Sequence, residues 1–156
     1  MYFSFSPRNY CEIQASYLVP PGSSIKHLKD VDKSGVRIAV KDRAAYDLWL
    51  TANLVHAILH KADSLDASFE LFRDEKLDAL AGLRPKLIEQ QKLMPGSLLF
   101  DESFMAVQQS IGCKPGNVEA AAYLRDFVVN AKLSGFAASL IDQFGVEGKL
   151  SVARDA

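Results

Sequence analysis

The hydrophobic pattern between Val36 and Gln91 switches repeatedly from short runs typical of buried strands to the spacing typical of helices. The predicted strands are Val36–Val40, Ala57–Ala62 and Leu77–Ala81. The predicted helices are Ala44–Leu54, a helix that begins at Asp63-Ser64, and a helix from Pro85 to about Gln91. This strand–helix order predicts an α/β fold built from parallel βαβ units, with helices on both faces of the sheet.

The flanking segments add further strands and two helices. Tyr10–Val19 alternates loosely and ends at Pro20-Pro21-Gly22, residues that cannot continue a strand. Further strand candidates are Leu98–Phe100 and Phe104–Ile111. Asn117 is predicted to cap a helix, and Ser134-Gly135 to separate it from a last helix that ends near Gly145.

Composition and the apolar pattern disfavour several classes of protein. The chain has 156 residues, enough for one ordinary core that would hide roughly 70% of the unfolded surface. It has 18 Lys and Arg against 19 Asp and Glu, so no positive excess favours binding to nucleic acid. No apolar run approaches the ~20 residues of a membrane span. The opening MYFSFSPRNY lacks the basic start and apolar stretch of a signal peptide, so we expect no export signal in this chain.

The sequence predicts neither a metal site nor a catalytic motif. Cys11 and Cys113 are far apart and form no CxxC pair. His56 and His60 are four residues apart, but the predicted change from helix to strand near Ala57 breaks the geometry of a metal site. No GxSxG motif is present. We therefore expect no metal, no cofactor and no enzymatic activity.

Three turns follow the predicted strands and are the candidate ligand sites: Lys41-Asp42-Arg43-Ala44, Asp63-Ser64 and Gly82-Leu83-Arg84. In open α/β sheets, ligands bind beyond the carboxyl ends of the strands, where helix N-termini supply free amides. Cations at a helix N-terminus oppose the helix dipole unless an anion lies between them. The turns therefore indicate a site for a carboxylate or another anion, held by amides, Lys41, Arg43 and Arg84. The alternative is that these cations are simply solvated, as most surface Lys and Arg are.

At the level of the whole chain, several segments occur in a characteristic order. They are Ile25-Lys26-His27-Leu28-Lys29-Asp30-Val31, Asp78-Ala79-Leu80 with Pro85, and Ser134-Gly135 with Phe144-Gly145. Their order resembles that of the bacterial extracellular solute-binding proteins of family 3, the receptors of polar amino-acid-type ABC importers. The resemblance covers roughly Tyr10 to Gly148.

The resemblance implies a periplasmic-binding-protein type II-like fold, in which two α/β lobes joined by two hinge strands close on a solute. For this chain it implies an N-terminal segment and first hinge strand over residues 1–22. Residues 23–103 would form one complete α/β lobe, and residues 104–156 a second hinge strand and the C-terminal helical pair of the other lobe. The opening part of that other lobe is expected to be missing, which leaves half a cleft.

The candidate ligand-binding residues are Lys41, Asp42, Arg43, Ala44, Ser64, Leu83 and Arg84. Two of them depart from the family. Arg43-Ala44 stands where the family has a Gly-Ser/Thr turn, and Leu83 stands where the family has an Asp that accepts an α-ammonium group. Lys41 matches a lysine that some members use. Replacing the family's Asp by Leu83 removes the acceptor for the ammonium group, which disfavours zwitterionic amino acids as ligands. The remaining cations would suit a carboxylate, a sulfonate or a similar organic anion, or the site is vestigial.

The resemblance implies a solute-binding component of an ABC-type importer, or a truncated relative, with a small-molecule solute and an ABC permease as partners. It places the chain in the periplasm, or in the cytoplasm if Met1 is the native start. The alternatives are a cyclohexadienyl-dehydratase-like enzyme using Asp42 or Asp63, and a dimeric scaffold. Without the rest of the other lobe, apolar positions of the last two helices would face water, so we expect a homodimer with hinge strands or terminal helices exchanged.

Overall fold

The computed structural model describes residues 4–5 and 9–154. The chain divides into two compact units: one contains the residues up to Ile13 and those from Val107 onward, and the other is Gln14–Ala106. Strand β2, Cys11–Val19, has residues in both units.

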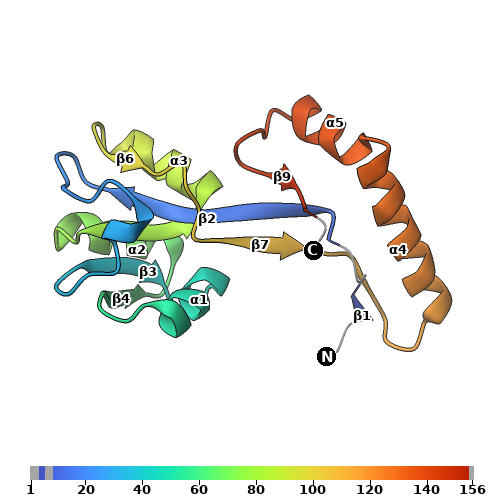
Figure 1. The fold of residues 1–156 in the computed structure, drawn as a ribbon, viewed down its shortest axis with the longest axis horizontal. Coiled ribbons are helices and arrows are strands. Elements are labelled where there is room, and N and C mark those ends of the chain that lie inside the picture. Colours follow the sequence, from blue (N-terminus) through green and yellow to red (C-terminus); the bar gives the residue numbers. More distant parts are fainter. Residues whose placement is uncertain (1–3, 6–8, 155–156) are drawn as a thin grey trace. The chain divides into compact units, whose positions relative to one another are not determined.

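The Gln14–Ala106 unit is built on a mixed sheet with strand order β4-β3-β5-β2-β6 (Figure 1). Its strands besides β2 are β3 (Arg37–Lys41), β4 (Ile58–Ala62), β5 (Ala79–Leu83) and β6 (Leu98–Leu99). Strand β3 is parallel to β4 and β5, whereas β2 is antiparallel to β5 and β6. Strand β7 (Met105–Gln109) also pairs with β2. The predicted parallel βαβ units are therefore confirmed, and β2 adds an antiparallel strand beside them.

Two hydrophobic clusters form the core of this unit. The helical elements are η1 (Leu28–Asp30), α1 (Ala45–Asn53), α2 (Leu65–Asp74) and α3 (Arg84–Leu93). Tyr17 of β2 belongs to the cluster that contains Leu50 of α1. Its neighbour Leu18 belongs to the cluster that contains Phe72 of α2 and Leu87 of α3. Consecutive strand residues point to opposite faces, so helices cover both faces of this sheet.

The other unit contains the last two helices, α4 (Val118–Leu133) and α5 (Phe136–Gln143). Its short strands are β1 (Ser4–Phe5), β8 (Gly112–Cys113) and β9 (Ser151–Val152). Strand β1 pairs with β8, and β9 pairs with the beginning of β2. The Asn117 side chain accepts a hydrogen bond of 3.0 Å from the Ala120 amide, which confirms the predicted N-cap of α4.

Some predicted boundaries are wrong by one to two residues. Strand β5 begins at Ala79 rather than Leu77, because Leu77 is buried in the loop after α2 and its amide bonds to Phe72. Asp78 accepts a 2.8 Å bond from the Arg37 amide at the start of β3. Among the described residues, no helix has both the length and the apolar character needed to cross a membrane.

Candidate functional site

The three candidate turns lie at the end of the sheet where the adjacent parallel strands β4, β3 and β5 reach their carboxyl ends. We call this carboxyl end of the sheet the edge. Lys41 is the register partner of Ala62, so the turn after β3 lies beside the turn that begins at Asp63. Ala39 is the register partner of Leu80, and the same register carried two residues further aligns Lys41 with Gly82. The turns containing Arg43 and Arg84 thus follow neighbouring strand ends.

The turn after β3 has an unusual backbone at Arg43. Arg43 has a φ of 57°, in the left-handed region where glycine is favoured. The family resemblance also places a glycine at this position, so the backbone here has the conformation that such a glycine adopts without strain. The Arg43 side chain is 88% exposed and points into solvent rather than into the protein. Lys41 donates a 2.6 Å bond from Nζ to the Asp42 carbonyl, inside the same turn.

Asp47, in the first turn of α1, holds this loop in place. Its carboxylate is fully buried. It accepts a 2.8 Å bond from the Arg43 amide and a 3.3 Å bond from the Thr51 hydroxyl. Lys61 of β4 places Nζ 3.0 Å from Asp47 Oδ1 and 3.7 Å from Asp42 Oδ1. The hydrogen bond to Asp47 is the main reason that the pKa of Lys61 is raised, so its ammonium stays charged at this edge.

Helix N-termini supply amides at the same edge. The N-caps of α1 and α3 are Ala44 and Leu83, and neither has a side-chain cap. The first amides of α1 are therefore not capped by a side chain and can donate hydrogen bonds to an anion. Ser64 is different, because its hydroxyl accepts a 3.0 Å bond from the Ala67 amide and caps α2. The structure therefore gives Ser64 a capping role, and a role in binding solute stays a prediction.

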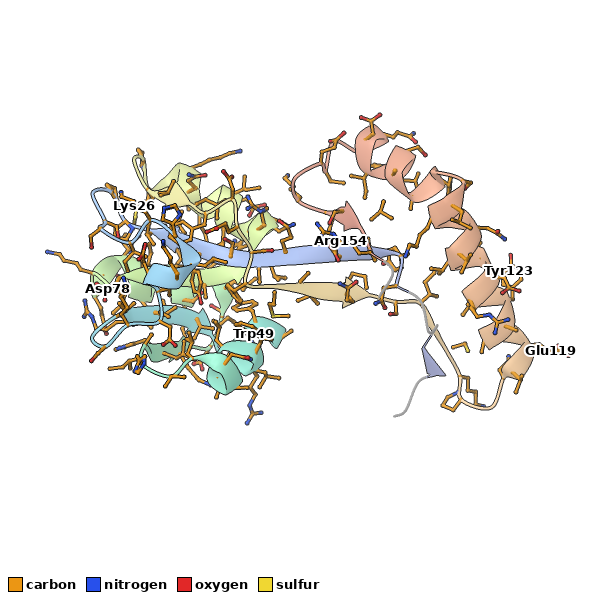
Figure 2. All side chains as sticks on the ribbon, viewed as in Figure 1. Lys26, Trp49, Asp78, Glu119, Tyr123 and Arg154 are labelled. Atoms are coloured by element: carbon orange, nitrogen blue, oxygen red, sulfur yellow. The ribbon has the colours of Figure 1, made fainter. Side chains whose placement is uncertain are left out.

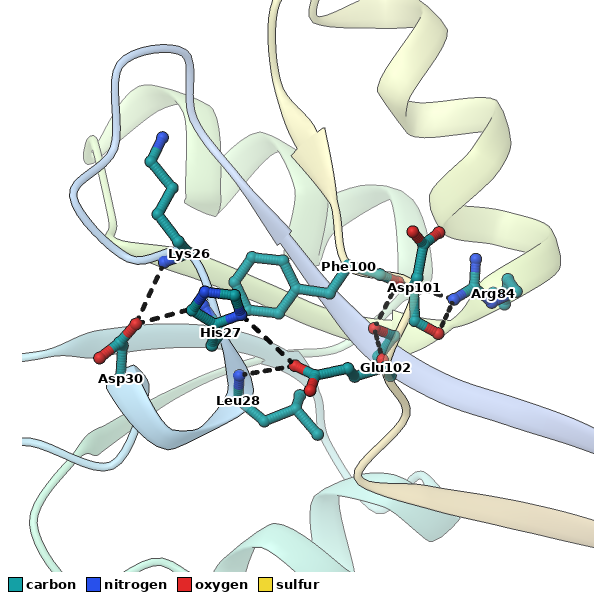
Figure 3. Close-up of polar contacts among 9 residues, drawn as sticks. Lys26, His27, Leu28, Asp30, Arg84, Phe100, Asp101 and Glu102 are labelled. Atoms are coloured by element: carbon teal, nitrogen blue, oxygen red, sulfur yellow. Dashed lines mark hydrogen bonds and ion pairs between the residues drawn. The ribbon is translucent and has the colours of Figure 1, made fainter.

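Arg84 has a structural role that the sequence did not indicate. Its Nη2 donates to the carbonyls of Phe100 and Asp101, at 2.7 and 2.6 Å (Figure 3). The Ser16 hydroxyl donates to the carbonyl of Phe100 at 3.1 Å and to that of Glu102 at 2.6 Å. Arg84 thus fixes the segment that follows β6, and its Nε is buried without a partner among the described residues. Its guanidinium is committed in part to the protein's own backbone, and its predicted bond to a solute is untested.

The charged side chains that surround the turn after β3 are therefore those of Lys41, Asp42, Arg43, Asp47 and Lys61. Sequence reasoning found the first three and missed Asp47 and Lys61. An Asp three residues after the turn, in the first turn of a predicted helix, is the signal that could have identified Asp47. The described residues contain no group of three or more His, Cys, Asp or Glu that could hold a metal ion.

No protein-family model matches the chain, and no curated protein matches it. Solved structures do match. A putative binding component of an ABC transporter from Wolinella succinogenes, complexed with lysine, is 19% identical with a TM-score of 0.73. That match covers 90% of this chain and 62% of the other.

Two further structures give the same result. A solute receptor for L-cysteine from Neisseria gonorrhoeae is 16% identical with a TM-score of 0.70, over 97% of this chain and 64% of the other. The ancestral amino acid-binding protein AncCDT-1, described as a precursor of cyclohexadienyl dehydratase, is 19% identical with a TM-score of 0.67. This last match covers 90% of this chain and 61% of the other.

The chain spans a little over three fifths of the length of these structures. Identities below about one fifth show a shared fold and leave the ligand open. The fold implied by the sequence resemblance is confirmed: the chain has the periplasmic-binding-protein type II-like α/β fold of these structures.

Proposed function

We propose that this chain is a solute-binding component of an ABC-type importer, or a shortened relative of one, within the family 3 solute-binding proteins. Its solute is a small polar or anionic molecule, such as an amino acid or an organic acid. The solute's anionic group binds at the turn after β3. The observation that carries this proposal is the uncapped N-terminus of α1 beside the cations Lys41, Arg43 and Lys61.

The charges at this edge favour an anion over a zwitterion. The Asp47 carboxylate is paired with Lys61. The Asp42 carboxylate lies 3.9 Å from Arg43 Nε and 3.7 Å from Lys61 Nζ. Lys41 has no carboxylate partner among the described residues, so its charge is available to a ligand. Leu83 offers no acceptor for an ammonium group. A carboxylate or sulfonate therefore gains a charge-assisted hydrogen bond that an α-ammonium group cannot match at this edge.

An enzyme of the same fold is the second candidate, because one structural neighbour is described as a precursor of cyclohexadienyl dehydratase. Such an enzyme needs an acid or base at the site. Asp42 acts as a counter-ion to Lys61 and Arg43, and Asp63 is exposed. We therefore favour binding over catalysis. Any turnover that is detected should be lost in D42A or D63A if the enzyme interpretation is correct.

An ABC permease would receive the solute, and the periplasm is the compartment in which such a receptor meets it. We also propose a homodimer, because the unit that contains α4 and α5 has an apolar cavity of about 460 Å³. Phe127, Phe136 and Phe144 line this cavity and are 44%, 50% and 71% exposed. A second copy offers an identical apolar surface that can bury these rings.

A thermal-shift screen tests the binding proposal. Amino acids, dicarboxylates and sulfonates are added separately, and the compound that binds the folded chain raises the melting temperature by mass action. In the variant K41M, about ten-fold more ligand should be needed for the same rise in melting temperature, because the substitution removes a charged hydrogen-bond donor. K26M is the matched control, since Lys26 is an exposed lysine outside the turn. A flat response across the screen, or an equal response in K41M, contradicts the proposal.

A further inference from the structure

A second cavity in the Gln14–Ala106 unit has a volume of about 420 Å³ and is lined by none of the candidate residues of the anion site. Its walls come from β2, η1 and the loop after it, α1, and the segment after β6. The volume lies in the range typical of small-molecule pockets. The lining combines aromatic rings with polar groups, mainly Tyr17, Lys29, Asp32, Trp49, Ser103 and Phe104.

Three aromatic side chains form one side of this cavity. Phe104 lies between the other two: its ring centroid is 4.7 Å from that of Tyr17 and 5.4 Å from that of Trp49. Trp49 and Phe104 are partly exposed, and Figure 2 shows Trp49 on α1. Ring faces of tryptophan and phenylalanine attract cations and also pack against apolar groups. This side of the cavity therefore suits a ligand with an apolar body and a positive charge.

Tyr17 brings an unpaired hydroxyl to the cavity. The residue is only 2% exposed, yet none of the hydrogen bonds among the described residues involves its hydroxyl. That hydroxyl is also not among the atoms sealed in the interior without a partner, which in the described part of the chain are Tyr46 Oη and Arg84 Nε. Because Tyr17 lines the cavity, the cavity is the place from which a ligand can reach this group. Burial, and to a lesser extent the charge of Asp32, raises the pKa of Tyr17, so the hydroxyl stays protonated at neutral pH.

Asp32 adds a fixed negative charge. Its carboxylate accepts backbone hydrogen bonds from Val55, His56 and Ala57 at 2.7 to 3.2 Å. The bonds from Ala57, His56 and Val55 lower the pKa of Asp32, so it is ionised at neutral pH. A carboxylate has room for further donors beyond these amides. Lys29 is the opposing charge in the lining, but it is exposed and its long side chain can extend into water.

We propose that this cavity binds a small organic ammonium compound with an apolar ring or chain. The ammonium group donates to the Tyr17 hydroxyl oxygen and to Asp32, and the apolar part lies against Trp49 and Phe104. This site is separate from the proposed anion site, and it requires a cation where the other requires an anion. It does not depend on the proposed transport function.

Nuclear magnetic resonance can test this proposal directly, because Trp49 is the one tryptophan of the chain and gives a single indole N–H signal. The probe is benzylammonium, compared with benzyl alcohol and benzoate, which have the same ring and a neutral or negative head. We expect a saturable shift of the indole signal with benzylammonium, at least ten-fold weaker binding of benzyl alcohol, and no binding of benzoate. The absence of a saturable shift, or benzoate binding as tightly as benzylammonium, would overturn the proposal.

Two pairs of variants locate the contacts. Y17F keeps the ring and removes the hydroxyl, so binding should weaken about five-fold, the typical value of one hydrogen bond. Y46F is its control, because Tyr46 is equally buried in the same cluster and does not line the cavity.

D32N should weaken binding at least ten-fold, whereas D30N, which alters another amide-bonded aspartate outside the cavity, should not. K29Q should tighten binding. Thermal unfolding confirms that each variant is folded, and unchanged binding in both Y17F and D32N would overturn the proposal.

Discussion

The buried carboxylate of Asp47 accepts a 2.8 Å hydrogen bond from the backbone amide of Arg43, four residues earlier in the chain. This bond fixes the left-handed backbone of Arg43 and, through the same carboxylate, ties the turn after β3 to Lys61 on β4. The orientation of the uncapped α1 amides relative to Lys41 therefore depends on a residue that need not contact the solute.

The first prediction concerns the stability of this turn. D47A leaves the Arg43 amide and the Thr51 hydroxyl without their acceptor, and it should lower the free energy of unfolding by about 2 kcal/mol. T51A removes the 3.3 Å bond to the same carboxylate and a 3.5 Å bond from Lys61 Nζ, but it leaves the buried carboxylate and its bond to the Arg43 amide in place, so it should cost clearly less. Urea denaturation measures both values. Equal stability of D47A and the wild type would show that the buried carboxylate does not hold the turn.

The second prediction concerns Arg43 itself. R43G should raise the free energy of unfolding by about 0.5–1 kcal/mol, because glycine adopts a φ of 57° without the strain that a side chain brings. K76G is a useful control, since Lys76 is the other described non-glycine residue with positive φ, at 51°, and it lies outside the site. R43G should also weaken the response to anions in the thermal-shift screen, whereas K76G should not. A destabilised R43G would contradict the strain argument.

The alternation of hydrophobic patterns was sufficient to predict the helices and longer strands around the site, because each had several apolar residues at a clear spacing. Strands β1, β8 and β9 have two residues each, too short for any periodicity to be detected. The long-range partners of Asp47 and Arg84 could not be predicted from the sequence. Asp47 bonds to Lys61, 14 residues away, and Arg84 bonds to Phe100, 16 residues away, and such partners are set by tertiary packing.

The third prediction concerns stability at low pH. Backbone hydrogen bonds from Ala57, His56 and Val55 lower the pKa of Asp32 below its usual 3.8. A carboxyl group whose pKa is lower in the folded state stabilises the fold above its unfolded pKa, and this contribution is lost as the pH falls through the folded value. D32N should therefore lose less stability than the wild type between neutral pH and pH values below 3.8. Urea denaturation across this range measures the difference, and parallel curves for the two proteins would contradict the assignment.

The fourth prediction concerns self-association. F144D places a charge on a ring that lines the apolar cavity of the α4–α5 unit and is 71% exposed, so it should shift the chain from dimer to monomer. L93D is the control, because Leu93 of α3 is also 71% exposed but does not line that cavity. Sedimentation velocity compares the two variants. A wild-type chain that is monomeric at all concentrations would contradict the homodimer.

The most direct test of the central claim is to map where the strongest stabiliser from the thermal-shift screen binds, using the backbone amide signals of the chain. The account predicts saturable shifts of the amides of Ala44, Ala45 and Tyr46, and loss of these shifts in K41M but not in K26M. Shifts confined to residues away from the turns after β3 and β5, such as the indole of Trp49, would contradict the claim that an anion binds at this edge of the sheet.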